Sequence, residues 1–411
     1  MTRRARHLGA GVVGVVMVAS LLACAGSEDA AILGDEADLA DAVLADDEAA
    51  LEDEAALHDP GAEPDTSVVP TTEAPVPPAR SVGWAAPRDR TRRLSILASG
   101  DILIHESVWE SARSYAGGGD DFDFSPMFEP ITPYVAGADL ALCHLEVPLS
   151  GDNSRLASFP MFSAPYQLAD AIAGAGYDGC SFASNHVLDR GVTGIEDTLG
   201  HLDRVGVGHA GAARSPDEAD EITTYEVRGT RVAHLSYTYG YNGLRPPVGE
   251  DWRSNLIDIA TILDDAARAR AEGAEVVVLS LHWGDEYVHE PNRYQLDVAT
   301  AVAPSSDIDL IIGHHPHVIQ PVEVVGGTPV TYSVGNQLSN MLQPERRDGV
   351  LFVYHLEAPP GGPFEVVEMS YLPTQVELPG HRIVPAPPDS WERTAAHLRS
   401  RGAELVPVVP D

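Results

Sequence analysis

The sequence predicts an α/β fold built from two stacked mixed β-sheets with helices on their outer sides. Five short apolar runs, rich in β-branched residues, each end in a polar residue or a glycine, as buried strands do. Segments with helical spacing of apolar residues lie between these runs, which is the alternation typical of α/β proteins. Four further runs follow one another without helices and indicate a second, more antiparallel sheet. With 411 residues, of which 44% are hydrophobic, the chain is long enough to bury a large core.

The amino terminus has the layout of an export signal. Arg3, Arg4 and Arg6 precede an apolar run of sixteen residues at 8–23, which is short for a membrane span and typical of a secretory signal. The run ends in Leu-Leu-Ala before Cys24, and this ending resembles the bacterial lipobox, in which cleavage leaves a lipid-modified cysteine. We therefore expect 1–23 to be a lipoprotein signal peptide and the protein to be extracytoplasmic and lipid-anchored to the cell membrane through Cys24. The alternative is an uncleaved anchor or an ordinary signal.

The next segment is strongly acidic. Sixteen acidic residues and no arginine or lysine lie between Glu28 and Glu73, and proline recurs between Pro60 and Pro87. Such a composition repels itself and buries little apolar surface, which predicts a disordered tether over 24–90. A short helix at 35–57 is the alternative. The folded domain is expected to cover 91–411.

The elements of that domain follow from the local pattern. The buried strands are expected at 94–99, 139–145, 178–184, 275–281 and 308–312. The helices between them are expected at 166–175, 193–205, 256–271 and 294–302. Gly229-Thr230 separates two apolar runs and predicts a hairpin of 222–228 with 231–237. Strands without helices are expected at 322–325, 329–334, 350–357 and 365–372. The segment 389–401 has the pattern of a surface helix, capped by Asp389 or Ser390.

The charged residues exclude several kinds of chemistry. The chain has 62 acidic and 26 basic residues, a formal net charge of −36, and every basic residue is an arginine. The absence of lysine excludes a Schiff-base lysine, a P-loop lysine and a Ser-Lys dyad. Nucleic acid is not expected as a partner, because phosphate binding requires a concentrated basic surface.

The expected strand ends carry oxygen and imidazole donors. Taken singly, each has an ordinary explanation: an aspartate or asparagine caps a helix, and a histidine packs in the core. Their joint position at the carboxyl ends of strands predicts a two-metal hydrolytic site, in which a carboxylate bridges cations about 3.5 to 4 Å apart. The candidate residues are Asp101, Glu146, Asn185, His186, His282, His315 and His317.

The motifs around these residues resemble those of the bacterial capsule-synthesis proteins of the CapA type, which look like calcineurin-type metallophosphoesterases. The matching strings occur in the family's order and together are highly specific. They are Gly100-Asp101, Leu145-Glu146 with Pro148-Leu149-Ser150, and the stretches 184–191, 282–287, 313–320 and 332–336.

The resemblance implies a metallophosphoesterase-like four-layer sandwich and a role for each matched residue. Asp101 would bind one metal, Asn185 and His282 the second, and Glu146 would bridge the two. His315 and His317 would be shared between the metals. His186 would protonate the leaving group, and Asp189 would orient it. The implied cofactor is one or two divalent ions, which the donor types allow to be Mn, Fe or Zn.

This chain departs from the family pattern at two histidines. The wider phosphoesterases have Asp-x-His at the first strand, whereas His105 lies four residues after Asp101, so that one fully occupied metal is an open alternative. His144 stands where the family usually has asparagine, and it is either an extra ligand or a packing or second-layer residue. For Cys143 and Cys180, two small buried thiols are favoured over a disulfide.

A substrate groove is less well defined by the sequence. Trp283, Tyr287, Tyr332 and the loop 154–164 are candidates for its lining. Three arginines are candidates for neutralising an anionic substrate, although arginine in a loop is most often solvated. They are Arg155, Arg190 and Arg245.

Three functions remain open from the sequence. The first is a surface-tethered, metal-dependent hydrolase that acts in capsule synthesis on a phosphoester, on poly-γ-glutamate or on a related cell-envelope polymer. The second is a non-catalytic component that binds or exports an anionic capsule polymer, and the third is a lipoprotein with a vestigial site. The expected partners are that polymer or phosphoester, the membrane through the lipid anchor, and a capsule synthase.

Overall fold

The computed structural model describes residues 90–410, and its first strand begins at Arg92. The predictions of a signal peptide at 1–23, of lipidation at Cys24 and of an acidic tether up to residue 89 lie outside the described residues. Within the described range, none of the helices is both long and apolar enough to cross a membrane.

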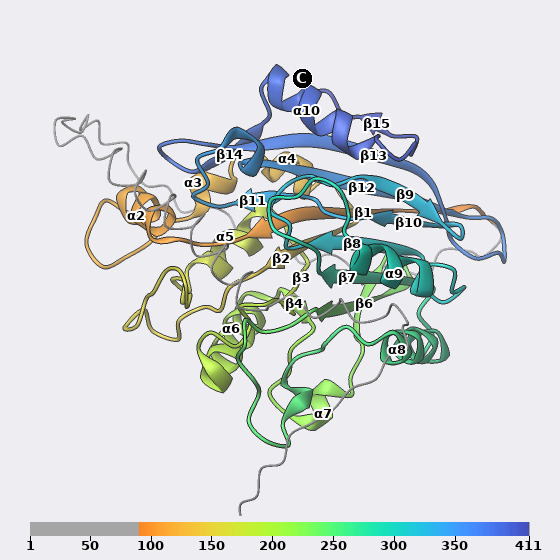
Figure 1. Ribbon diagram of the computed structural model, residues 1–411, viewed down its shortest axis with the longest axis horizontal. Coiled ribbons are helices and arrows are strands. Elements are labelled where there is room, and N and C mark those ends of the chain that lie inside the picture. Colours follow the sequence, from red (N-terminus) through yellow and green to blue (C-terminus); the bar gives the residue numbers. More distant parts are fainter. Residues whose placement is uncertain (1–89, 411) are drawn as a thin grey trace, which may run out of the picture. The chain divides into compact units, whose positions relative to one another are not determined.

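The first sheet has nine strands and combines a parallel with an antiparallel half (Figure 1). Its main path runs β14-β13-β12-β1-β2-β3-β4, with β11 paired to β1 and β15 paired to β13. Strands β1 to β4 are parallel, while β12, β13 and β14 continue the sheet from β1 in antiparallel pairs. The strands are β1 (Arg92–Ile102), β2 (Leu140–Leu145), β3 (Gly179–Ser181), β4 (Gly208–Ala210), β11 (Asn336–Leu338), β12 (Asp348–Ala358), β13 (Glu365–Glu377), β14 (Arg382–Pro385) and β15 (Val406–Pro407).

The second sheet has six strands in the order β5-β6-β7-β8-β10-β9. Strands β6, β7, β8 and β10 are parallel, and the antiparallel pairing of β5 with β6 confirms the predicted hairpin. Its turn is Arg228-Gly229 instead of Gly229-Thr230, because Thr230 begins β6 and pairs with Val227. The strands are β5 (Thr223–Val227), β6 (Thr230–Thr238), β7 (Val276–His282), β8 (Leu310–His314), β9 (Val322–Val325) and β10 (Thr328–Thr331).

Three hydrophobic cores separate the layers. Alternate residues of a strand point to opposite faces, so Val276 and Val278 of β7 enter the core between the sheets, whereas Val277 and Leu279 enter an outer core. Helices cover both outer faces, and the predicted four-layer sandwich is confirmed. The helices are α2 (Glu106–Tyr115), α3 (Ser125–Phe128), α4 (Thr132–Val135), α5 (Leu168–Ala175), α6 (Gly191–Val205), α7 (Pro216–Ala219), α8 (Ile259–Ala271), α9 (Arg293–Val302) and α10 (Pro388–Leu398), with 3-10 turns η1 (Asp251–Arg253) and η2 (Pro344–Arg346).

Two predicted elements differ in detail. The strand predicted at 178–184 ends at Ser181, and the chain beyond it leaves the sheet, where the Ser184 hydroxyl donates to the carbonyl of Glu146. The helix predicted at 389–401 is α10, and neither Asp389 nor Ser390 caps it. Pro387 occupies the cap position without a side-chain hydrogen bond, and the Ser390 hydroxyl donates instead to Asp348.

The prediction of two buried thiols is wrong. Cys143 of β2 and Cys180 of β3 are register partners with a Cα–Cα distance of 4.4 Å, and they form a disulfide. The sequence could not show this, because the pairing depends on the order of strands in the sheet. The bond joins β2, which directly precedes Glu146, to β3, which ends four residues before Asn185.

Removing this disulfide is expected to destabilise the domain. Because the bond spans 37 residues, its loss in a C143A/C180A variant should lower the free energy of unfolding by about 2–4 kcal/mol, mainly through the entropy of the unfolded chain. Urea denaturation of the full-length protein measures the change. Reductant should shift the wild-type midpoint and leave the variant unaffected; equal midpoints for the two proteins would contradict the prediction.

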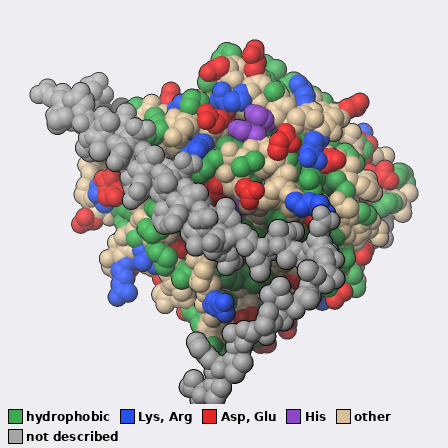
Figure 2. Space-filling model, viewed as in Figure 1, with side chains coloured by type: hydrophobic (Ala, Val, Ile, Leu, Met, Phe, Trp, Pro, Cys, Tyr) green, Lys and Arg blue, Asp and Glu red, His purple; other side chains and the backbone are tan. Residues whose placement is uncertain are grey.

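The charges on the described surface reflect the excess of acidic over basic residues in the sequence. Where described residues are visible in Figure 2, acidic and arginine side chains are interspersed and form no continuous basic area. Most arginines of the described part lie within 4 Å of a carboxylate, as Arg92 does with Glu275 and Arg204 with Asp170. The arginines are therefore largely neutralised by the excess of acidic residues.

Candidate functional site

The candidate residues come from strand ends of both sheets. Asp101 lies near the end of β1, Glu146 follows β2, and His282 is the last residue of β7. Neighbouring parallel strands end at the same edge of a sheet, and the stacking of the sheets brings the two edges together. All of these side chains are buried, and Asp101 and Glu146 are 0% exposed.

A first group of donors consists of Asp101, Glu146 and His317, whose ligand atoms lie within 4.8 Å of one another. His317 stands between the two carboxylates: its Nδ1 is 3.1 Å from Asp101 Oδ2, and its Nε2 is 3.4 Å from Glu146 Oε1. Burial acts to lower the pKa of His317, but Glu146 and Asp101 outweigh it and hold the pKa well above its usual value. The two carboxylates therefore favour positive charge at this point.

A second group consists of Glu146, His282 and His315, again within 4.8 Å. His282 Nε2 lies 3.9 Å from Glu146 Oε1 and 3.0 Å from Asn185 Oδ1. Burial lowers the pKa of His282 well below its usual value and that of His315 to about 3. Both imidazoles are therefore neutral near pH 7, which is the state in which imidazole binds a metal.

Glu146 belongs to both groups, and its carboxylate has no hydrogen-bond donor among the described residues. The imidazoles of His317 and His282 lie 3.4 and 3.9 Å from it, and proteins compensate a buried charge by such pairing or by metal coordination. His315 Nδ1 is likewise buried without a hydrogen bond. This set of carboxylate, amide and imidazole donors fits one or two divalent cations.

The histidine motif after β8 adopts an unusual backbone. His315 and His317 have φ angles of 95° and 54°, in the left-handed region that costs about 1–3 kcal/mol for residues other than glycine. The His315 amide donates to Asp101 Oδ2 at 3.1 Å, which helps to hold the turn. Gly313 is required by its surroundings, because a Cβ there would lie 1.8 Å from the Tyr332 carbonyl oxygen.

His186 and Asp189 form a pair beside the donors. His186 Nδ1 is 2.8 Å from Asp189 Oδ2, which also accepts the Phe162 amide at 2.7 Å. Burial acts to lower the pKa of His186, but the hydrogen bond and charge of Asp189, with Glu146 and Glu286, raise it above its usual value. His186 is in none of the donor groups found among the described residues.

His105 and His144 have different positions. His105 precedes α2 and packs its ring edge-on against Phe162, with the ring centroids 5.0 Å apart, outside the donor groups. His144 belongs to a donor group with Asp101 and His314, and it also bonds through Nε2 to His282 Nδ1 at 2.9 Å. The donor group fits the alternative of an extra ligand, and the hydrogen bond to His282 fits the alternative of a second-layer residue.

Sequence reasoning missed three residues at this site. His314 Nδ1 lies 3.0 Å from Asp101 Oδ1, Glu286 forms a donor group with His315 and His317, and Tyr239 packs 4.8 Å from the His315 ring. Tyr239 is 41% exposed. His314 is the last residue of β8, and Tyr239 directly follows β6. The rule that located the other candidates at strand ends therefore applies to them as well.

The predicted groove lining is partly wrong. Trp283 and Tyr332 are fully buried and stack on each other, with ring centroids 5.9 Å apart, so neither is available to a substrate. Tyr287 is partly buried, and the Arg346 guanidinium lies over its ring at 3.6 Å.

Two of the three candidate arginines share a cavity. Arg155 and Arg190 line a cavity of about 610 Å³, together with Asp152, Asp197 and several hydroxyl groups, whereas Arg245 is exposed elsewhere. Arg190 directly follows Asp189 in the chain, but neither His186 nor Asp189 lines this cavity.

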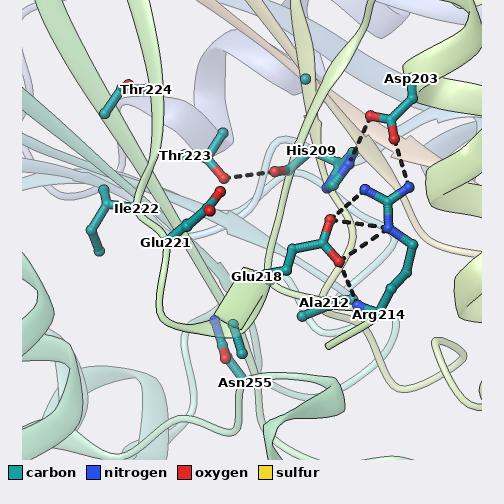
Figure 3. Close-up of a pocket in the computed structure, with 14 residues that line it drawn as sticks. Asp203, His209, Ala212, Arg214, Glu218, Glu221, Ile222, Thr223, Thr224 and Asn255 are labelled. Carbon is teal, nitrogen blue, oxygen red and sulfur yellow. Dashed lines mark hydrogen bonds and ion pairs between the residues drawn. The ribbon is translucent and has the colours of Figure 1, made fainter. Parts of the chain in front are cut away.

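A separate cavity of about 420 Å³ lies between β4 and β5 (Figure 3). Its charged groups bind one another: Arg214 reaches Asp203 Oδ2 at 2.6 Å and forms several hydrogen bonds with Glu218, and His209 Nε2 is 3.2 Å from Asp203 Oδ1. None of the candidate catalytic or metal-binding residues lines it.

Comparison with known proteins identifies the family. A family model described as bacterial capsule synthesis protein PGA_cap matches residues 95–341. The PGA biosynthesis protein CapA of Bacillus subtilis (strain 168) is 34% identical over 206 residues, which cover 50% of this chain and 51% of that protein. The capsule biosynthesis protein CapA of Bacillus anthracis is 28% identical over 271 residues, with 64% of each chain covered. The chain thus spans between half and two thirds of the length of these relatives.

Among solved structures, the calcineurin-like phosphoesterase YfkN from Bacillus subtilis superposes with a TM-score of 0.42 and 16% identity, covering 69% of this chain and 91% of that one. The family model covers more than half of the sequence and includes all the candidate metal-binding residues. The protein therefore belongs to the bacterial capsule synthesis protein PGA_cap family.

Proposed function

We propose that this protein is a metal-dependent hydrolase that acts on a phosphoester, on poly-γ-glutamate or on a related cell-envelope polymer. The observation that carries this proposal is Glu146, a fully buried carboxylate shared by two groups of donors and without a hydrogen-bond donor among the described residues. The names of the two CapA relatives support an envelope polymer as the context.

The donors suggest how two cations would be held. Asp101 and His317 would bind one, His282, Asn185 and His315 the other, and Glu146 both. This division assigns His315 and His317 to different cations, although the two histidines also form a group with Glu286. Divalent Mn, Fe or Zn would supply Lewis acidity and make hydroxide available near neutral pH.

The His186 pair would supply the proton for the leaving group. Asp189 holds His186 through Nδ1, which directs Nε2 away from Asp189, and the raised pKa favours the protonated ring. A positioned acid with a pKa near the working pH is suited to protonate a leaving group. His186 would act as the general acid, and Asp189 would fix its orientation and tautomer.

The cavity lined by Arg155 and Arg190 would accept the anionic part of the substrate. Arg190 donates to the Met161 carbonyl oxygen at 3.1 Å and forms no ion pair with a carboxylate of residues 90–410, so its charge is available to an anion. An R190A variant is expected to raise KM about tenfold, as the loss of one charge-assisted hydrogen bond predicts, with kcat little changed. Steady-state kinetics measure both; R245A is the control. A change in kcat alone would contradict the assignment.

Export and anchoring extend the proposal beyond the described residues. We propose that 1–23 is removed, that Cys24 becomes lipid-modified, and that 24–90 tethers the domain outside the cell membrane near a capsule synthase. The support is the arginine-rich start, the apolar run and the Leu-Leu-Ala-Cys ending. Mass spectrometry of the mature amino-terminal peptide tests it: an unmodified Cys24 would exclude the lipid anchor.

The hydrolase is tested with the purified full-length chain. Elemental analysis gives the bound metal, and turnover is measured with Mn²⁺, Zn²⁺ or Fe²⁺ on a phosphodiester, a phosphomonoester and poly-γ-glutamate. Metal-dependent turnover that disappears in D101N and H282A variants supports the proposal. Tight polymer binding without turnover would replace it with the non-catalytic alternative.

A further inference from the structure

A chain of buried polar groups leads from the candidate metal centre into the first sheet. His282 Nδ1 lies 2.9 Å from His144 Nε2, and His144 Nδ1 lies 2.8 Å from Ser181 Oγ. The Ser181 hydroxyl in turn donates to the carbonyl oxygen of Cys143 at 3.3 Å. The three side chains are at most 1% exposed. These hydrogen bonds therefore connect His282 to the backbone of β2 without contact with solvent.

The fold fixes the positions of these hydrogen-bonded side chains. His144 and Ser181 are register partners on β2 and β3, and the disulfide links the residues that precede them. His282 ends β7 in the other sheet, so the contact of His144 with His282 crosses from one sheet to the other. His144 also stacks on His314 at 4.1 Å. Stacking and strand pairing thus fix the plane of the His144 ring.

The Cys143 carbonyl oxygen, at the end of this series of hydrogen bonds, determines the direction in which each group donates. A carbonyl oxygen only accepts hydrogen bonds, so the Ser181 proton points to Cys143, and the Ser181 oxygen accepts from His144 Nδ1–H. A neutral imidazole has one N–H and one lone pair, so His144 Nε2 accepts from His282 Nδ1–H.

The consequence appears at His282 Nε2, which then carries a lone pair. That lone pair faces Asn185 Oδ1 at 3.0 Å and Glu146 Oε1 at 3.9 Å. Three electron-rich atoms directed at one another are compatible with a cation between them. We propose that His144 and Ser181 are positioning residues that hold His282 as its Nδ1–H tautomer and thereby present its Nε2 lone pair to a divalent cation.

This inference rests on the proposed function, because it takes His282 as a ligand. The reverse direction is the competing arrangement: Ser181 would donate to His144, His144 Nε2–H to His282, and His282 Nε2–H to Asn185. It would satisfy the hydrogen bonds among the side chains but would take the Ser181 proton from the Cys143 carbonyl oxygen, and it would block His282 as a ligand. Replacing Ser181 separates the two directions, because only the first requires its oxygen as an acceptor.

The test measures the affinity of metal-free, full-length protein for Zn²⁺ by competition with a chelator. In S181A, His144 Nδ1–H loses its acceptor, and one Zn²⁺ is expected to bind about 10–100-fold more weakly, as for other groups that orient a metal-binding histidine. The matched control is S280A. Ser280 Oγ lies 2.9 Å from His234 Nε2 in a comparably buried Ser–His pair of the second sheet, and neither residue belongs to a donor group among the described residues. S280A is expected to keep wild-type affinity.

A second set of variants distinguishes orientation from general packing. In H144Q, the side-chain carbonyl of the glutamine accepts from His282 whether or not Ser181 is present. Adding S181A to H144Q should therefore change the Zn²⁺ affinity little. H144L offers no acceptor and should weaken Zn²⁺ binding as S181A does. Nitrogen-15 shifts of the His282 ring in the Zn²⁺-loaded protein should show the proton on Nδ1. Thermal melting of each variant checks that it is folded.

The outcomes separate the two proposals. Equal affinities of S181A, S280A and wild type, or a His282 proton on Nε2, would overturn the role of His144 and Ser181 while leaving a metal centre in place. A wild-type protein that binds no Zn²⁺ would overturn both that role and the metal-dependent hydrolase.

Discussion

Replacing Glu146 with glutamine is expected to release the bound metal and to lower hydrolysis by about 10³-fold or more. Glu146 is the carboxylate shared by both donor groups, and a neutral amide offers neither its charge nor its second anionic oxygen. Metal ions contribute several kcal/mol to transition-state stabilisation, and each 1.36 kcal/mol is a factor of ten in rate. Elemental analysis and kcat measure the two losses on the same preparation.

Thermal melting provides an independent reading of the same variant. A ligand present at about 100 times its Kd stabilises the folded state by about 2.7 kcal/mol. The wild-type melting temperature should therefore rise when metal is added, and that of E146Q should not. E226Q, which removes a surface carboxylate paired with Arg231, is the control and should behave as the wild type. An E146Q protein that retains both metal and turnover would refute the bridging role.

Replacing His186 with alanine is expected to lower kcat by about 10²–10⁴-fold, the usual contribution of a positioned general acid, while the metal content stays unchanged. The donor groups do not include His186, and its only charged hydrogen-bond partner among the described residues is Asp189. Substrates with a poor leaving group depend on protonation, so the loss should be largest for an alkyl ester and smaller for a nitrophenyl ester.

Two further variants control this result. H105A removes a histidine that packs on the same Phe162 ring but lies outside the donor groups, and it should change kcat by less than about tenfold. D189N should resemble a weaker form of H186A, because it leaves the imidazole without its orienting carboxylate. A parallel loss of metal and activity in H186A would make His186 a ligand or a structural residue instead of an acid.

The sequence by itself predicted two stacked sheets with outer helices and the strand ends that carry the candidate site. It did not show which strands share a sheet. The strands β12 and β13, expected in a separate antiparallel sheet, lie with β1 in the first sheet, whereas β7 and β8 lie in the second. The patterns that predict strands and helices are local. Apolar residues recur every 2 residues along a strand and every 3.6 along a helix, because one face of the element is buried. Parallel strands end on one side, so polar residues after β1, β2, β3 and β8 were expected to meet. Asp101 and Glu146 share an edge of the first sheet for this reason, and the stacking of the second sheet brings His282 and His317 to them.

Only the tertiary structure decided which side chains contact one another. His144 meets His282 across two sheets, His314 meets Asp101, and the disulfide joins two strands that are 37 residues apart. The burial of Trp283 likewise follows from packing against Tyr332. Such contacts depend on sheet order and on how the sheets stack, which involve residues far apart in the chain, and no local pattern carries that information.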